Sequence, residues 1–237
     1  MKEYGPLLEV IACSVADAVE AERGGAGRLE VIGNFEIGGL TPPFDLVRDV
    51  LAAVRIPVRV MLRESEGYTV TEAGESRRLC AAARDLARLR VDGLVLGLLR
   101  SGEIDEDLME RILSCAPNLR ATFHHAFEET SDPLQAIRRL KTHRQIDHIL
   151  TAGGQGDWPQ KIARLASYER EARPEITILA GGGLESRLIK SLREMTGIRA
   201  FHVGRAARLP QSVEGAVHAT SVRELTRIVG AAPMGER

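Results

Sequence analysis

Residues 7–12 have the sequence Leu-Leu-Glu-Val-Ile-Ala, and residues 28–32 have the sequence Arg-Leu-Glu-Val-Ile. Each is a short and largely apolar run, which is typical of a strand in a buried sheet. The segment between them begins at Ser14, whose side chain can cap a helix, and Asp17 follows three residues later as a capping partner. A strand, a helix and a second strand in this order predict a βαβ unit with parallel strands.

The same unit recurs along the chain. Helical spacing of apolar residues marks segments such as Asp45–Val54, Glu75–Leu89 and Pro133–Leu140. The eight apolar runs are Leu7–Ala12, Arg28–Ile32, Pro57–Leu62, Val91–Gly97, Leu119–His124, Ile146–Thr151, Ile176–Ala180 and Ile198–Val203. Eight such units in 237 residues match the size of a closed barrel. We predict the α/β class and a single (β/α)8 TIM-type barrel domain over residues 1–237.

The composition narrows the classes of function. The chain has 32 basic and 33 acidic residues and a formal net charge of −1, so it lacks the basic excess of a nucleic-acid-binding surface. It has no apolar run of about 18 residues, so we expect no membrane span. Residues 1–6 lack the long apolar segment of a signal peptide, and the three cysteines are far apart, as is typical of reduced thiols. We therefore expect a cytoplasmic protein with no nucleic-acid or membrane partner.

Charged and polar side chains stand near the ends of several predicted strands, where the active sites of such barrels form. Glu9 and Glu30 each lie between two apolar residues, so both carboxylates point into the barrel if those neighbours pack against outer helices. The predicted catalytic residues at this rim are Glu9, Glu30, Arg63, His124 and His202. The other histidines are expected at a loop start or without comparable neighbours: His125, His143, His148 and His218.

Two interpretations of the buried charges stay open. Charges inside a barrel are costly unless they are paired. Glu9, Glu30, Arg59 and Arg63 could therefore neutralise one another in an ion-pair cluster that only stabilises the barrel. Alternatively, the carboxylates and His124 form a site that binds a ligand or moves protons.

Glycines close the seventh and eighth predicted strands. Gly181, Gly182 and Gly183 follow one strand, and Gly204 with Arg205 follows the next. In barrels of this class these two loops can bind an anion such as phosphate through backbone N–H groups and a helix amino terminus. Arg205 could add a bidentate donor. The alternative is that the glycines only allow tight turns.

Ligands for a soft metal ion are sparse in the sequence. Cu(I) needs thiolates or thioethers, and only Cys13 lies close enough to a strand end to reach the rim, whereas Cys80 and Cys115 fall on outer helices. No C-x-x-C motif, zinc-ligand spacing or G-x-S-x-G motif occurs. Cys13 is therefore a weak metal candidate that also fits as a small buried apolar residue, and we expect weak binding of Cu(I).

Several motifs, in order along most of the chain, make the sequence resemble the CutC copper-homeostasis family as a divergent member. They are Leu8–Val10, Gly24–Glu30, Gly38–Pro42, Ile56–Arg63, Asp92–Gly97, Thr122–Phe127, Asp132–Leu134, Ile149–Gly154, Gly181–Gly183 and His202. The most specific are G-G-L-T-P at 38–42 and T-F-H-x-A-F at 122–127. The resemblance implies a cytoplasmic (β/α)8 barrel, often a homo-oligomer, with a proposed role in copper homeostasis. The chain departs from the family pattern at Ile32, where the family often has Cys, and at Arg59, where it has His.

Two functions are open at this point. The first, implied by the resemblance, is copper homeostasis with copper as the bound metal. The second, drawn from the charged rim and the glycine loops, is a barrel enzyme that acts on a small anionic substrate, including a phosphorylated one. Such an enzyme would be an isomerase, a lyase or a hydrolase. Both functions imply a small-molecule or metal ligand.

Overall fold

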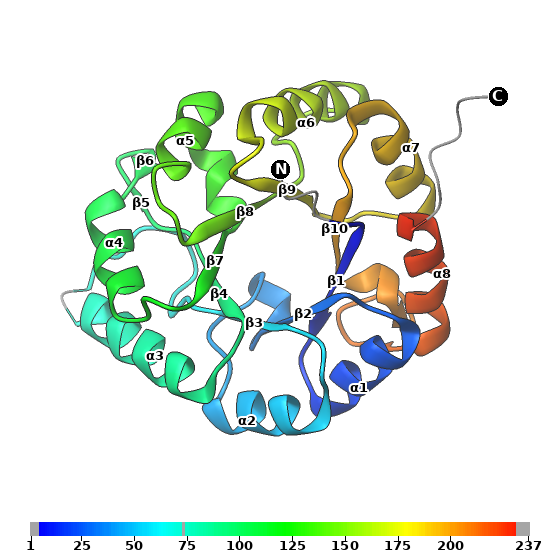
Figure 1. Ribbon diagram of the computed structural model, residues 1–237, viewed down its shortest axis with the longest axis horizontal. Coiled ribbons are helices and arrows are strands. Elements are labelled where there is room, and N and C mark those ends of the chain that lie inside the picture. The colour runs from blue at the N-terminus through cyan, green and yellow to red at the C-terminus, as the bar shows by residue number, and fades with distance from the viewer. Residues whose placement is uncertain (1–4, 73, 231–237) are drawn as a thin grey trace.

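A closed barrel of eight parallel strands forms the centre of the protein, and helices surround it (Figure 1). The computed structural model describes residues 5–72 and 74–230, and every structural statement below concerns these ranges. Around the barrel the strands follow the order β1-β10-β9-β8-β7-β4-β3-β2. The predicted TIM-type barrel is confirmed. The ends of the predicted domain, residues 1–4 and 231–237, lie outside the described ranges. The prediction that residues 1–6 form no signal peptide therefore falls mostly outside them as well.

Each predicted apolar run contains one barrel strand. The strands are β1 (Leu7–Ala12), β2 (Arg28–Val31), β3 (Val58–Met61), β4 (Gly93–Leu96), β7 (Arg120–Phe123), β8 (Ile146–Thr151), β9 (Thr177–Ala180) and β10 (Ala200–Val203). The helices are α1 (Val15–Gly24), α2 (Phe44–Ala53), α3 (Glu75–Leu89), α4 (Glu106–Ser114), α5 (Pro133–Leu140), α6 (Trp158–Ala172), α7 (Ser186–Thr196) and α8 (Ala219–Gly230). Several predicted runs extend beyond their strand, because flanking apolar residues such as Ile176 and Ile198 are also buried.

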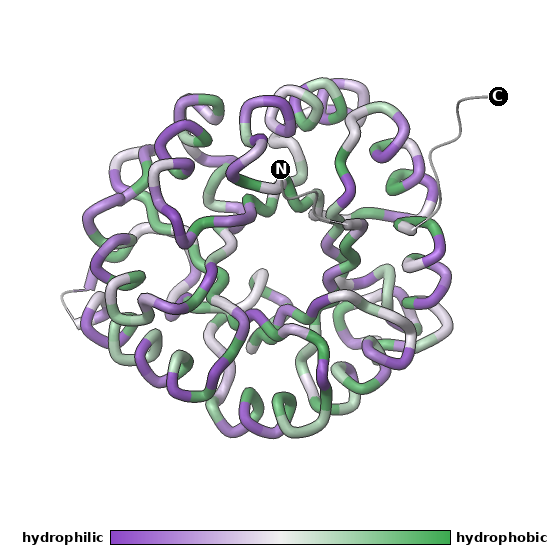
Figure 2. Tube along the Cα trace, in the orientation of Figure 1, coloured by the Kyte–Doolittle hydropathy of each residue, from purple (hydrophilic) through white to green (hydrophobic). Residues whose placement is uncertain are grey.

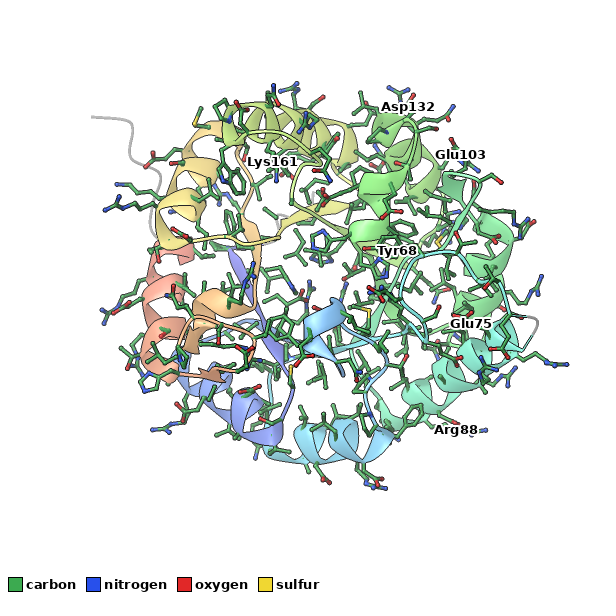
Figure 3. The ribbon with its side chains drawn as sticks, turned by 180° about the vertical axis from the view of Figure 1, so that it is seen from behind. Tyr68, Glu75, Arg88, Glu103, Asp132 and Lys161 are labelled. Carbon is green, nitrogen blue, oxygen red and sulfur yellow. The ribbon has the colours of Figure 1, made fainter. Side chains whose placement is uncertain are left out.

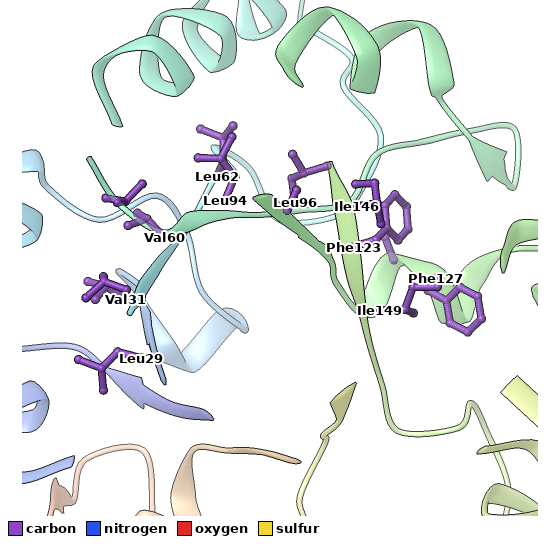
Figure 4. Close-up of a cluster of buried hydrophobic side chains, with 14 of the residues drawn as sticks. Leu29, Val31, Val60, Leu62, Leu94, Leu96, Phe123, Phe127, Ile146 and Ile149 are labelled. Atoms are coloured by element: carbon purple, nitrogen blue, oxygen red, sulfur yellow. The ribbon is translucent and has the colours of Figure 1, made fainter. Parts of the chain in front are cut away.

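The main hydrophobic core lies between the barrel and the helices. Alternate strand residues such as Leu29, Val31 and Val60 are completely buried and point away from the barrel axis (Figure 4). Apolar residues follow the strands and the inner helix faces, whereas hydrophilic residues dominate the outer faces (Figure 2). Because side chains alternate along a strand, the pattern that builds this core also directs Glu9 and Glu30 into the barrel.

The barrel interior is only partly apolar. Two small clusters of apolar side chains lie inside it: Ile11, Ile32, Met61 and Val95, and separately Leu150, Leu179 and Ala200. Among the remaining inward side chains are Glu9, Glu30, Arg59 and His202, each at most 6% exposed. The interior therefore holds charges that must be satisfied within the protein.

Short elements interrupt the loops at the carboxyl end of the barrel. They are the hairpin β5 (Leu99–Arg100) and β6 (Glu103–Ile104), the hairpin β11 (Arg208–Leu209) and β12 (Ala216–Val217), and the 3-10 helices η1 (Phe35–Ile37), η2 (His125–Glu129) and η3 (Arg205–Ala207). Each follows a barrel strand, so these elements surround the barrel mouth. Nowhere in residues 5–72 and 74–230 is a helix both long and apolar enough to span a bilayer.

Candidate functional site

A cavity of about 500 Å³ opens at the carboxyl end of the barrel. Strand ends and the loops after them form its walls. The acidic, basic and histidine residues that line it are Glu30, Glu36, Arg63, His124, His125, Glu185, His202 and Arg205. A cavity of this size accommodates a small molecule or a metal ion with its ligands.

Four of the five predicted catalytic residues line the cavity: Glu30, Arg63, His124 and His202. Glu9 is completely buried and does not line it. The expectation that Glu9 shares the cavity wall is therefore wrong. Ile11, two residues later on the same face of β1, occupies the wall, so Glu9 lies one layer deeper in the barrel. The catalytic roles of all five residues stay predictions.

Glu9, His202 and Glu30 form a chain of buried contacts that ends at the cavity. His202 Nδ1 lies 2.8 Å from Glu9 Oε1, and His202 Nε2 lies 3.4 Å from Glu30 Oε2. Glu30 Oε1 is buried without a hydrogen-bond partner in the described part of the chain. One ligand atom from each of the three residues lies within 4.8 Å of the others, which is close enough to hold one metal ion.

The environment shifts the pKa values of these three groups differently. Burial disfavours ionised Glu9, but the charge of Arg28 and the hydrogen bond with His202 outweigh it and hold the pKa of Glu9 well below its usual range. Burial raises the pKa of Glu30 to about 7, against the attraction of His202. Burial alone would lower the pKa of His202, but the charges of Glu30 and Glu9 raise it. Near neutral pH Glu9 is therefore an anion, whereas the pKa of Glu30 lies close to neutrality and the neighbouring carboxylates favour protonated His202.

An ion-pair network lies below this chain of contacts. Arg28 Nε donates to Glu9 Oε2, and Arg28 Nη1 lies 3.4 Å from His148 Nε2. Arg59 donates to both carboxylate oxygens of Asp147, at 2.7 and 2.8 Å. His148 Nδ1 lies 2.8 Å from Asp147 Oδ1, so the expectation that His148 has no comparable neighbours is wrong. Sequence analysis missed Arg28, although its position two residues before Glu30 places it on the same inward face of β2.

The buried charges are paired, but not with the partners that the sequence analysis considered, which were Glu9, Glu30, Arg59 and Arg63. Glu9 pairs with Arg28, and Arg59 pairs with Asp147 and, at 3.1 Å, with Asp92. The two interpretations that the sequence left open therefore apply at different depths. The lower layer is a structural ion-pair network, and the upper layer faces the cavity.

Arg63 lies in the cavity wall and keeps its charge available. Its Nε donates to the backbone oxygens of Ser65 and Gly67 at 2.9 and 3.2 Å, and its guanidinium carbon lies 5.1 Å from the centre of the Tyr68 ring. No carboxylate within residues 5–72 and 74–230 forms an ion pair with it. Figure 3 shows Tyr68 much nearer the barrel axis than Arg88, which lies at the periphery. Backbone and ring contacts thus fix Arg63 while leaving a net positive charge at the cavity.

His124 is buried and neutral. Burial lowers its pKa to about 3, and the charges of His125 and Arg63 act in the same direction. Its Nδ1 accepts a hydrogen bond from Ala126 N at 3.2 Å, so we assign the proton of the neutral ring to Nε2. Nε2 has no partner among the described residues. His124 therefore offers the cavity a hydrogen-bond donor, and its predicted part in ligand binding or proton transfer stays a prediction.

His125 also lines the cavity, which the sequence analysis did not expect of it. Its Nδ1 lies 2.8 Å from Glu128 Oε1. The same oxygen accepts hydrogen bonds from Thr151 Oγ1 at 3.1 Å and from Ala152 N at 2.6 Å, both at the end of β8. Burial would raise the pKa of Glu128, but the hydrogen bond and charge of His125 lower it. An anionic carboxylate thus fixes the imidazole ring, an arrangement found in acid–base and metal sites.

The glycine loops form part of the cavity wall, and Gly204 lies against Phe35 of η1. Gly182 and Gly183 have φ values of 86° and 77°, so tight turns require glycine there. Gly182, Gly183, Gly204 and Arg205 line the cavity, and Arg205 has no ion pair within the described ranges. Gly181 does not line it, and its N–H donates to Thr151 O at 3.0 Å. Gly181 is therefore not available to an anion, whereas anion binding by the other four residues stays a prediction.

The cysteines lie outside the cavity. Cys13 packs against the apolar cluster that contains Ile11 and Met61, and Arg208 Nη2 lies 3.5 Å from its sulfur. Burial raises the pKa of Cys13, which disfavours the thiolate that a metal needs, so its metal role stays only a prediction. Cys80 and Cys115, which are far apart in the sequence, both lie within hydrogen-bonding reach of the carbonyl oxygen of Arg111, and all three thiols are free.

The fold and the cavity define a class of protein: a (β/α)8 barrel with a cavity and a buried carboxylate–histidine cluster at its carboxyl end. The sequence model of the CutC family matches residues 6–207, and the chain belongs to that family.

Related proteins agree with this assignment. A family protein CutC from Xanthomonas axonopodis pv. citri is 36% identical over 196 residues, which is 82% of this chain and 81% of that protein. The copper homeostasis protein cutC homolog of Homo sapiens is 33% identical over 199 residues, 84% of this chain and 72% of that protein. The crystal structure of the putative copper homeostasis protein CutC from Streptococcus agalactiae has a TM-score of 0.78 at 27% identity, and the match covers 84% of this chain and 98% of that one.

Proposed function

We propose that this protein acts in copper homeostasis by binding copper as Cu(II) on Glu30 and His202 at the base of the cavity. The observation that carries the proposal is the cluster of Glu9, Glu30 and His202, whose ligand atoms lie within 4.8 Å of one another. The names of related proteins in the family point to copper as the metal. The oxygen and nitrogen donors of this site favour its Cu(II) state.

The donor set fits Cu(II) better than Cu(I). Carboxylate oxygen and imidazole nitrogen suit Cu(II), whereas Cu(I) prefers sulfur. Neither Cys13 nor any other cysteine lines the cavity. Glu30 Oε1 is a buried acceptor without a partner among the described residues, and a bound cation would satisfy it.

Glu9 orients the histidine in this proposal. Its Oε1 contacts His202 Nδ1 at 2.8 Å, which leaves Nε2 toward Glu30 and the cavity. A carboxylate behind a ligating histidine fixes the ring and raises its basicity. Arg28 neutralises the charge of Glu9, so we expect Glu9 to support the ion from the second layer.

Protons compete with the ion. The pKa of Glu30 is about 7, so this carboxylate is partly protonated near neutral pH, and the raised pKa of His202 favours its protonated form. A cation can bind only as these protons leave, and its affinity therefore rises as the pH increases through 7.

Electron paramagnetic resonance and calorimetry with Cu(II) test the proposal. Glu30→Gln should lower the affinity by more than about tenfold, and Glu9→Gln by about 10- to 100-fold, as second-layer changes do. His202→Gln should abolish the nitrogen hyperfine coupling. Glu185→Gln, at another carboxylate of the cavity wall, is the matched control and should bind as the wild type does. Equal affinities of the wild type and Glu30→Gln would refute the site.

A second function rests on one observation. Arg63 and Arg205 line the same cavity without a carboxylate partner in the described ranges, which favours a small anionic ligand. In that case Glu30 and His202 would move protons in an isomerase, lyase or hydrolase step.

We also propose a cytoplasmic location, which the free thiols support. We further propose that the protein is a homo-oligomer, and light scattering would measure its oligomeric state.

A further inference from the structure

Two cysteines meet on the outside of the barrel, away from the cavity. Cys80 belongs to α3, and Cys115 is the residue directly after α4. The sulfur of Cys115 lies 3.3 Å from Arg111 O, and the sulfur of Cys80 lies 3.9 Å from the same oxygen. Burial is the main cause of the raised pKa of Cys80, and the neighbouring Cys115 thiol contributes to it. Helix packing therefore brings together two thiols that are 35 positions apart in the sequence.

We propose that Cys80 and Cys115 form a Cu(I) site in which the two sulfur atoms are the only protein ligands. Cu(I) is a soft ion that prefers thiolates and accepts low coordination numbers. Binding forms two Cu–S bonds and releases the two thiol protons, and no electron is transferred. The resulting bis-thiolate complex carries one negative charge.

Two arginines beside the thiols favour that charge. The guanidinium groups of Arg84 and Arg111 both act on Cys80, in the direction that stabilises its thiolate. Neither arginine forms an ion pair with a carboxylate in the described part of the chain. Their charges are thus free to stabilise an anionic complex, although burial opposes ionisation of the apoprotein thiols.

The pair is accessible and differs from Cys13. Cys80 is 6% exposed at the edge of the core, while Cys115 is half-buried, so an ion can enter from the side of Cys115. Cys13 has no second thiol beside it and packs against apolar side chains. This pair revises the expectation of weak Cu(I) binding, which assumed that the chain has no clustered thiols.

Anaerobic competition for Cu(I) against bicinchoninate tests this site. We expect the reduced wild type to withdraw one equivalent of Cu(I), and Cys80→Ser and Cys115→Ser each to withdraw none. Cys13→Ser is the matched control and should withdraw one equivalent. The double variant Arg84→Gln/Arg111→Gln should bind more weakly, with the difference shrinking at high salt.

X-ray absorption of the loaded wild type should show sulfur scatterers only, which separates this site from a nitrogen- and oxygen-based one. Retention of Cu(I) by Cys80→Ser, or loss of binding in Cys13→Ser, would overturn the proposal. Failure of the wild type to withdraw copper would do so too. Circular dichroism of each variant confirms that it is folded. The result is independent of the Cu(II) site, because Glu30→Gln should leave Cu(I) uptake unchanged.

Discussion

Arg59→Met removes the centre of the ion-pair network below the cavity. Arg59 is 2% exposed and donates to four oxygen atoms: both carboxylate oxygens of Asp147, Thr122 Oγ1 and Asp92 Oδ2. Methionine fills a similar volume without a charge. The substitution therefore isolates the loss of the pairing.

Asp147 dominates the expected loss of stability. Its side chain is 12% exposed, and without Arg59 only His148 remains beside it, whereas Asp92 is 35% exposed and can be hydrated. Removal of one partner of a buried pair costs about 3–5 kcal/mol of the free energy of unfolding. This is a large part of the roughly 5–15 kcal/mol that a typical protein has.

The pH dependence should change as well. Burial would raise the pKa of Asp147, but hydrogen bonds from His148 and Arg59 hold it well below its usual range. A lowered carboxyl pKa gives stability that is present above the unfolded pKa and is lost as the pH falls. Arg59→Met weakens that lowering, so its free energy of unfolding should fall less steeply on acidification than that of the wild type.

Urea unfolding followed by far-ultraviolet circular dichroism measures both effects. Arg48→Met is the matched control, because the Arg48–Asp45 pair is exposed and should contribute less than about 1 kcal/mol. An Arg59→Met protein within about 1 kcal/mol of the wild type would show that the reasoning on this network is wrong.

Four further predictions concern the cavity. Millimolar phosphate should raise the melting temperature of the wild type more than that of Arg205→Ala, and equal responses would remove the anion-binding interpretation of the glycine loops. The His124 ring should stay neutral in nuclear magnetic resonance titrations down to a pH of about 3, and a midpoint near 6.5 would contradict the lowering of its pKa by burial. The raised pKa of Glu30 makes the free energy of unfolding fall as the pH rises from 4.5 to about 7, so Glu30→Gln should flatten that slope. Gly182→Ala should destabilise the protein by more than about 1 kcal/mol, because its φ is positive and the new methyl group would lie 2.6 Å from Ala152 Cβ; Gly67→Ala, also at positive φ but in open space, should lose less.

The sequence predicted the barrel because strand periodicity is a local signal. The run at 146–151 and the helices at 75–89 and 133–140 have the predicted bounds, since apolar spacing and caps such as Asp132 mark them directly. Inward directions were also predictable, because phase within a strand decides which face a side chain occupies.

Partners and depth could not be predicted in the same way. Whether Glu9 faces the cavity or lies below it depends on the stagger of β1 against its neighbours, and no single strand contains that information. Asp147 has the outward phase, yet its side chain reaches Arg59 inside the barrel. His125 enters the site only because η2 bends the chain after β7, and Cys80 meets Cys115 only through the packing of α3 on α4.

The proton position on His124 gives the cavity a fixed polarity. The donor, His124 Nε2, lies at the end of β7, and an acceptor, Glu30 Oε1, lies on β2. Two strands, β4 and β3, separate β7 from β2 around the barrel. A ligand that spans the cavity must therefore present an acceptor to one side and a donor or cation to the other. Turned end for end, the same molecule would bring two acceptors together at Glu30 and two donors together at His124, so the barrel mouth distinguishes the two ends of whatever it binds.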